Sequence, residues 1–147
     1  MGSKVIFSDL ELFLTGRIRQ ALAAVPGDPY AGVFVANEFY SPDELVPRPD
    51  PPFQVVVRDD GGPRTGVNTK SVSARVTVLG SDTGNARGTA ELANLVAVIV
   101  EGCPGAEPGN PVAAVTASNG PFRVPEESGR PRRYMTFTLS VTGLEYA

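Results

Sequence analysis

The sequence predicts an α+β domain: an antiparallel or mixed sheet of about 4–5 strands with two helices packed on one face. Two segments, 8–25 and 83–101, repeat apolar residues at helical spacing, and several others alternate apolar and polar residues as strands do. The strand-like segments follow one another with few helical crossovers, which is typical of α+β domains. We expect the order helix, three strands, helix, two strands (α-β-β-β-α-β-β), within a single domain that spans residues 1–147.

The first helix is expected over residues 8–25. Ser8 and Glu11 match the S-x-x-E capping box, in which the serine hydroxyl and the glutamate carboxylate each accept a hydrogen bond from a free backbone N–H. Pro26 and Gly27 end the helical pattern. Apolar residues at steps of three and four form one stripe, made of Leu10, Phe13, Leu14, Ile18, Ala21, Leu22 and Val25. This stripe indicates that the helix packs through one face.

The next three strands are expected over 32–39, over 53–60 and over 67–80. The last two should pair as an antiparallel hairpin, because a turn signal closes the first of them and a short polar stretch separates them. The tip of this hairpin, at about 60–66, is expected to protrude. Five prolines between residues 42 and 52 indicate an extended surface loop at about 40–52.

The second helix is expected over 83–101, and the Gly-Cys-Pro sequence that follows it is a stop signal. The stretch before it, LGSDTGNARG at 79–88, leads from a strand into a helix and is rich in glycine, as phosphate-binding turns are. Its spacing matches neither G-x-G-x-x-G nor G-x-x-x-x-G-K-[ST], so helix capping is the favoured interpretation. The candidate caps are Ser81, Asp82 and Asn85.

The last two strands are expected over 111–118 and 132–147, joined by a polar connection rich in proline and glycine at about 119–132. The final strand alternates most regularly. Its apolar residues, which we expect in the core, are Met135, Phe137, Leu139 and Val141. The residues expected on its other face, toward solvent or another chain, are Tyr134, Thr136, Thr138, Ser140 and Thr142.

The sequence lacks the usual equipment for catalysis. It contains no histidine, which removes the commonest general base, the commonest metal ligand and every Ser-His-Asp or Cys-His arrangement. The single cysteine, Cys103, has no thiol partner, and we expect it to be a small buried or half-buried residue. The paired carboxylates at 43–44, 59–60 and 126–127 fall in expected turns or loops and match no calcium-loop pattern. We therefore expect no enzyme activity, no cofactor and no bound metal.

Charge is unevenly distributed along the chain. The net charge is -3, which disfavours general nucleic-acid binding. Residues 1–63 hold nine acidic residues against five basic ones, whereas residues 119–133 hold four arginines against two glutamates. Such unlike patches could meet head-to-tail between copies, or they could be solvated loops without a partner. The candidate residues for a subunit or partner interface are Arg64, Arg123, Arg130, Arg132, Arg133 and Tyr134.

The ends and the apolar runs of the sequence bear on where the protein resides. The N-terminal stretch MGSKVIFSDL has no long apolar region, so we expect no signal peptide. The longest apolar run, LVAVIV at 95–100, is far shorter than the roughly 20 residues that a membrane span needs. We expect a soluble, non-secreted protein without a membrane partner.

Several features together resemble the tail terminator proteins of long-tailed, siphovirus-type bacteriophages. They are a capped N-terminal helix, a hairpin with a protruding tip, a long alternating C-terminal strand, and the strand-to-helix passage ARVTVLGSDTGNARGTAELANLV at 74–96. The resemblance spans nearly the whole chain and lies in the order and length of the elements. Eleven arginines against two lysines suit a GC-rich genome, and together with this resemblance they suit a phage of an actinobacterial host.

The resemblance implies a structural virion protein rather than an enzyme. Such proteins form a ring, expected to hold six copies, that caps the tail tube, ends tube polymerisation and joins the tail to the head connector. The implied partners are the chain itself, the major tail tube protein and the connector or stopper protein, and genome DNA passes through the lumen without specific recognition. The implied location is the virion tail or neck, after assembly in the host cytoplasm.

Other functions stay open at this point. The chain could be another neck or tail component: a head–tail adaptor, a stopper or the tube subunit. It could be a small anion- or nucleotide-binding domain that uses residues 80–88, or a cytoplasmic regulator that binds a partner through the loop at 119–133.

Overall fold

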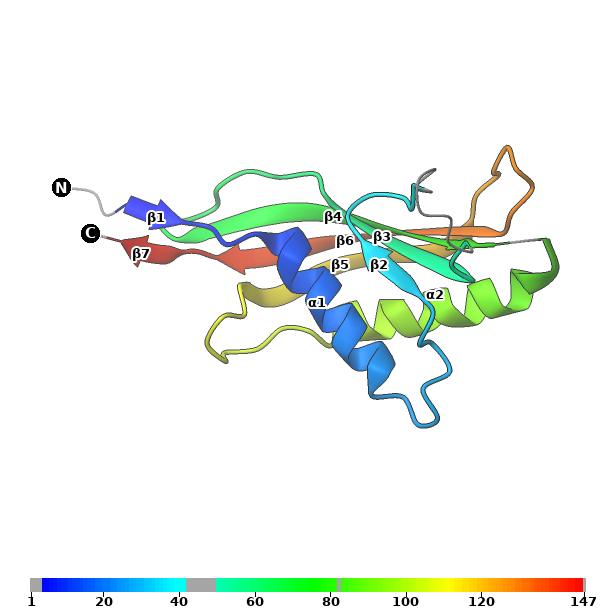
Figure 1. The fold of residues 1–147 in the computed structure, drawn as a ribbon. Helices are drawn as coiled ribbons and strands as arrows, with labels where there is room; N and C mark the ends of the chain where they lie inside the picture. The colour runs from blue at the N-terminus through cyan, green and yellow to red at the C-terminus, as the bar shows by residue number, and fades with distance from the viewer. Residues whose placement is uncertain (1–3, 42–49, 82, 147) are drawn as a thin grey trace.

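A five-stranded mixed sheet with two helices forms the body of the protein (Figure 1). The computed structural model describes residues 4–41, 50–81 and 83–146. The strand order is β2-β3-β4-β6-β5, and both helices lie on the same side of the sheet. This arrangement confirms the α+β class, and the order of the helices and the sheet strands agrees with the order expected from the sequence.

Helix α1 spans Leu10–Ala23 and buries one face, as its apolar stripe predicts. The predicted capping box is wrong, because Asp9 is the N-cap and its Oδ1 accepts a hydrogen bond from the N–H of Leu12 at 3.0 Å. The carboxylate of Glu11 is used elsewhere. It accepts hydrogen bonds from the backbone N–H of Asp59 at 2.7 Å and from Nδ2 of Asn37 at 3.0 Å.

Strands β2 (Phe34–Ala36), β3 (Phe53–Asp59) and β4 (Thr69–Gly80) form one side of the sheet. The predicted hairpin is confirmed, since β3 and β4 pair antiparallel with Val55 opposite Val78. Strand β2 is shorter than the predicted 32–39 and pairs parallel to β3. Most of the loop predicted at 40–52 lies outside the described residues.

The hairpin tip at 60–66 is exposed but does not project freely. It runs back along β4, where the N–H of Ser71 donates to the carbonyl of Pro63 and the N–H of Ser73 donates to that of Gly61, both at 2.9 Å (Figure 1). These hydrogen bonds continue the β3–β4 pairing beyond the end of β3. The protruding tip expected from the sequence is therefore a strap that lies along its own sheet.

Helix α2 (Ala86–Glu101) follows a short 3-10 turn, η1 (Thr83–Asn85), and together they match the helix predicted over 83–101. Asn85 occupies the N-cap position, but its side chain makes no capping hydrogen bond. Its Nδ2 instead donates to the carbonyl of Pro52 at 3.1 Å, which ties the turn to the start of β3. Of the other candidate caps, Asp82 lies outside the described residues.

Strands β5 (Val112–Arg123) and β6 (Arg132–Thr142) pair antiparallel and complete the sheet. The loop predicted at 119–132 is wrong in its first part, because β5 continues through Pro121 to Arg123 with several register shifts. A long neighbouring strand gives these residues backbone partners, so pairing overrides their turn-like composition. The segment predicted as one strand over 132–147 is interrupted after Thr142.

The two ends of the described chain pair with each other. Strand β7 (Leu144–Tyr146) runs antiparallel to β1 (Lys4–Ile6) in a separate two-stranded sheet. This ribbon extends beyond the main sheet at the end opposite the start of α2 (Figure 1). Neither β1 nor the pairing was predicted, since three-residue strands carry almost no periodic signal.

The core lies between the sheet and the two helices. The four apolar residues predicted on the inner face of β6 are all at most 2% exposed: Met135, Phe137, Leu139 and Val141. They pack with residues of α1, α2, β3 and β4 in one cluster. In the described part of the chain, no helix is long and apolar enough to cross a membrane.

Candidate functional site

A hollow of about 460 Å³ lies where the β5–β6 connection meets the start of α2. Five arginines line it: Arg87, Arg123, Arg130, Arg132 and Arg133. We call it the arginine hollow. Four of these residues are among the interface candidates predicted from the sequence, and the fold brings them together. Arg87 was not predicted, because its exposed i,i+4 pair with Glu91 looks like an ordinary helix-surface pair.

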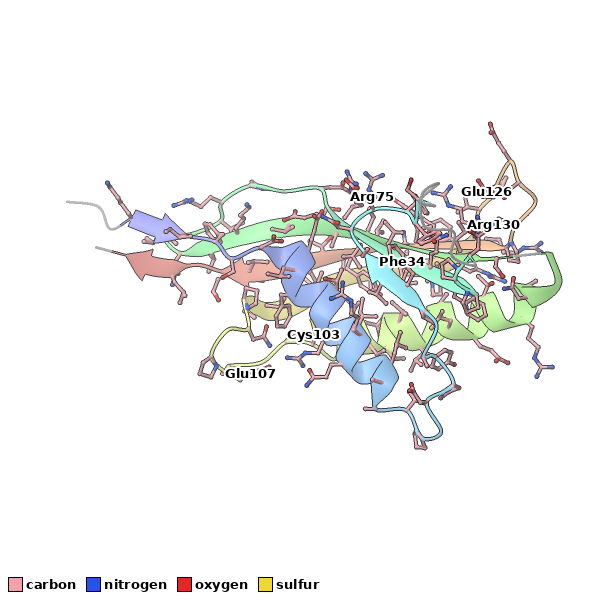
Figure 2. The ribbon with its side chains drawn as sticks, in the orientation of Figure 1. Phe34, Arg75, Cys103, Glu107, Glu126 and Arg130 are labelled. Atoms are coloured by element: carbon pink, nitrogen blue, oxygen red, sulfur yellow. The ribbon has the colours of Figure 1, made fainter. Side chains whose placement is uncertain are left out.

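Backbone contacts fix the arginine hollow against the glycine-rich turn. Nε of Arg130 donates to the carbonyl of Gly80 at 2.6 Å, and the N–H of Gly80 donates to the carbonyl of Pro131 at 2.9 Å. Figure 2 shows Arg130 beside the end of β4, near Glu126. Two segments that are distant in the sequence, 79–88 and 119–133, therefore form one structural unit.

Two guanidinium groups, one at the hollow and one at its edge, have unused donors; the one at the edge is that of Arg132, whose Cζ lies 5.8 Å from the ring centroid of Phe39. Nη2 of Arg130 and Nε of Arg132 are buried, and neither has a hydrogen-bond partner among the described residues. A buried donor without a partner carries a desolvation cost of roughly 1–3 kcal/mol, and more when the group is charged. An acceptor supplied from outside the chain would remove that cost.

Glu126 is the one carboxylate that lines the arginine hollow. Hydrogen bonds from the hydroxyl and N–H of Ser128, together with the positive charges of Arg132 and Arg130, lower the pKa of Glu126. Glu126 is therefore ionised at neutral pH. Five guanidinium charges less one carboxylate leave the hollow with a net charge of +4.

An acidic surface lies at the start of α1 and the far end of β3. Its four carboxylates are those of Asp9, Glu11, Asp59 and Asp60, and we call it the acidic patch. Asp60 makes an exposed ion pair with Arg75 at 3.2 Å, and Asp59 accepts a hydrogen bond from the N–H of Gly61 at 2.7 Å.

Strand β3 separates the two charged surfaces. Its first residue, Phe53, is opposite Gly80, to which Arg130 is bonded, and its last residue, Asp59, belongs to the acidic patch. A seven-residue strand has six steps of about 3.3 Å, so the surfaces lie roughly 20 Å apart along the strand. The protein thus carries opposite charge at opposite ends of one strand.

The last two interface candidates lie elsewhere. Tyr134 faces the uncovered side of the sheet, where its ring contacts Phe122 edge-to-face with centroids 5.5 Å apart. Arg64 belongs to the strap along β4, and its guanidinium lies 5.2 Å from the ring centroid of Phe7. Arg64 is therefore not part of the arginine hollow.

In the glycine-rich turn, the backbone N–H groups of Gly80 and Ser81 are already used within the chain. The N–H of Gly80 is bonded to Pro131, and the N–H of Ser81 donates to the carbonyl of Pro52 at 3.1 Å. A Cβ at Gly80 would lie 2.3 Å from Oδ1 of Asn85, so the turn is filled by its own side chains. In this arrangement glycine permits close packing, and the free N–H groups of a phosphate cradle are not present at these two positions.

Cys103 is 1% exposed, which confirms the prediction that it is a buried residue. Burial raises its pKa to about 11, against a partial lowering by the positive charge of Arg17. Its thiol is therefore protonated at neutral pH, and a protonated thiol is a poor nucleophile. Across the residues that the structure describes, no group of three or more His, Cys, Asp and Glu side chains could hold a metal ion.

In comparisons with known proteins, no family model and no curated protein matches this chain.

Proposed function

We propose that the protein is a structural virion component: a tail terminator whose ring of six copies caps the tail tube, ends tube polymerisation and joins the tail to the head connector. The proposal is supported by the sequence resemblance and by the one-sided architecture of the sheet. It places the protein in the tail or neck of the virion, and it requires no catalytic step.

The observation that carries the proposal is the face of β5 and β6 that neither helix covers, whereas on β3 and β4 the same face is closed, with Gln54, Val56, Thr77 and Leu79 at most 6% exposed. Both helices lie on the other face, and the outward residues of β6 are only half-buried (Figure 1). Strand β5 is a twelve-residue edge strand that pairs, within the described chain, with β6 alone. A long edge strand beside an uncovered polar face offers backbone and side-chain groups to a neighbouring chain.

Assembly through such a surface suits a ring. A contact between two different surfaces of identical chains is head-to-tail, and it closes into a ring when its rotation allows. The net charge of -3 repels DNA phosphates, which favours a lumen through which DNA moves without being held. The partners in this proposal are a second copy of the chain, the tail tube protein and the connector protein.

Negative-stain imaging with light scattering tests this proposal. The purified protein is measured alone and with preformed tail tubes. We expect discs of six copies, either free in solution or bound to tube tips. Long tubes formed by the protein itself would identify it as a tube subunit. A protein that stays monomeric and does not bind to tail tubes would overturn the proposal.

A second candidate function is binding of a small anion, and the unpartnered guanidinium donors of Arg130 and Arg132 favour it. Thermal melting with inorganic phosphate, pyrophosphate and nucleotides distinguishes this candidate, because a ligand that binds the folded state raises the melting temperature. Two results together would support anion binding rather than ring assembly: a saturable rise in melting temperature that is lost in Arg123→Gln, and no assembly of the protein on tail tubes.

A further inference from the structure

We infer that neighbouring copies contact each other by placing the acidic patch of one copy against the arginine hollow of the next. This inference rests on the proposed ring and names the surfaces that build it. The occupant of the arginine hollow is thus a second copy of this chain.

Charge complementarity is the first reason. The hollow carries a net charge of +4, and the patch carries four carboxylates with Arg75 as a nearby counter-charge. Unlike surfaces of this kind guide association and exclude wrong registers, because like-charge contacts are costly. Two copies that meet hollow-to-hollow or patch-to-patch would repel each other, so only the head-to-tail arrangement is favoured.

Hydrogen bonding is the second reason. The buried donors of Arg130 and Arg132 need acceptors that the described chain does not supply. Carboxylates are the acceptors that match guanidinium geometry, and such charged pairs are stronger than neutral hydrogen bonds. The acidic patch offers carboxylates on a helix start and a strand end, which are fixed positions rather than loose loops.

The position of the two surfaces is the third reason. The two surfaces lie at opposite ends of β3, so the acidic patch of one copy can contact one neighbour while its arginine hollow contacts a second neighbour. Each copy then makes the same pair of contacts. This is a heterologous contact, which generates a ring if it closes and a filament if it does not.

A complementation experiment tests the pairing. The first variant, Arg123→Gln with Arg133→Gln, lowers the net charge of the hollow from +4 to +2 and leaves the patch intact. The second variant, Asp59→Asn with Asp60→Asn, removes two of the four carboxylate charges of the patch and leaves the hollow intact. We expect each variant alone to associate at least about tenfold more weakly than wild type.

Mixing the two variants gives the decisive result. Two contacts are possible between the two variants. The intact hollow of the second variant can bind the intact patch of the first, whereas the altered hollow of the first and the altered patch of the second cannot restore the other contact. We therefore expect the mixture to stop at heterodimers, whose mass analytical ultracentrifugation measures, while wild type forms rings. Arg17→Gln, a neutralisation on α1 outside both surfaces, should assemble as wild type does.

The outcomes separate the inference from the proposed function. If both variants form rings as well as wild type does, the pairing is overturned and the ring stands. The same holds if each variant melts as wild type does but their mixture forms no heterodimers. A wild type that does not assemble even with tail tubes would overturn the ring and the pairing together. Pyrophosphate that saturates the hollow without weakening wild-type rings would show that the hollow serves a small anion instead.

Discussion

At the scale of single residues, side chains that look equivalent in the sequence have different roles in the structure. Ser8 and Asp9 are both common N-cap residues, and the sequence pattern favours Ser8 because Glu11 follows at the right distance. In the structure Glu11 is bonded to the end of β3, and Asp9 caps α1. A local motif cannot reveal that a distant strand competes for one of its members.

Asp9→Ala should therefore destabilise the protein, because it removes the acceptor for the N–H of Leu12. The expected loss is about 1 kcal/mol in the free energy of unfolding, the usual cost of removing an N-cap. Denaturant unfolding measures it. Ser8→Ala is the matched control and should change stability little; a larger loss in Ser8→Ala than in Asp9→Ala would restore the capping box.

Cys103 makes stability depend on pH in the alkaline range. Its pKa is raised by burial from 9.0 to about 11 in the folded state. The unfolded thiol ionises first, so its ionisation lowers the free energy of the unfolded state as pH rises above 9. The stability of the folded state falls until its own thiol ionises near pH 11. The stabilising contribution is complete below pH 9.

We expect the free energy of unfolding of wild type to fall between pH 9 and pH 11 relative to that of Cys103→Ala. The difference between the two proteins isolates the thiol, because every other ionisable group is common to both. Denaturant unfolding at several pH values measures it. Parallel curves for the two proteins would show that Cys103 does not ionise differently in the folded and unfolded states.

At the scale of elements, the sequence predicts best where a periodic pattern is long. Strand β6 and helix α2 could be placed because their apolar residues repeat over many positions. Strand β1, its pairing with β7, and the far half of β5 could not, since their strand form depends on a partner strand far away in the sequence. The arginine hollow was predicted in part, because four of its arginines lie close together in the sequence and Arg87 does not.

Helix α1 contains a glycine at position 16, and Gly16→Ala should stabilise it. A Cβ there would meet no atom within 4 Å, so the alanine gains helix propensity without a clash. The expected gain is roughly 0.5–1 kcal/mol in the free energy of unfolding. Gly88→Ala in α2 is the matched comparison and should gain less, because its Cβ would lie 3.0 Å from Cζ of Phe53. An equal gain at both positions would contradict the packing described at Gly88.

At the scale of the whole molecule, surfaces of opposite charge lie at the two ends of β3, and the proposed contact between copies depends on their attraction. Ring assembly should therefore weaken with salt, because the screening length falls from about 10 Å at 0.1 M to about 3 Å at 1 M. Light scattering across this range should show the mass per particle falling toward that of one copy. A mass that is independent of salt would indicate that other contacts, such as backbone pairing along the β5 edge, hold the ring together in place of the charged surfaces.

The most direct measurement of the central claim is the length of tail tubes that assemble with and without this protein. Purified tube subunits are allowed to polymerise, the protein is added at a fixed time, and tube lengths are measured from electron micrographs. If the protein is a terminator, elongation stops after the addition and a disc is seen at one end of each tube. Tubes that continue to lengthen at the same rate, with bare ends, would contradict the proposed function.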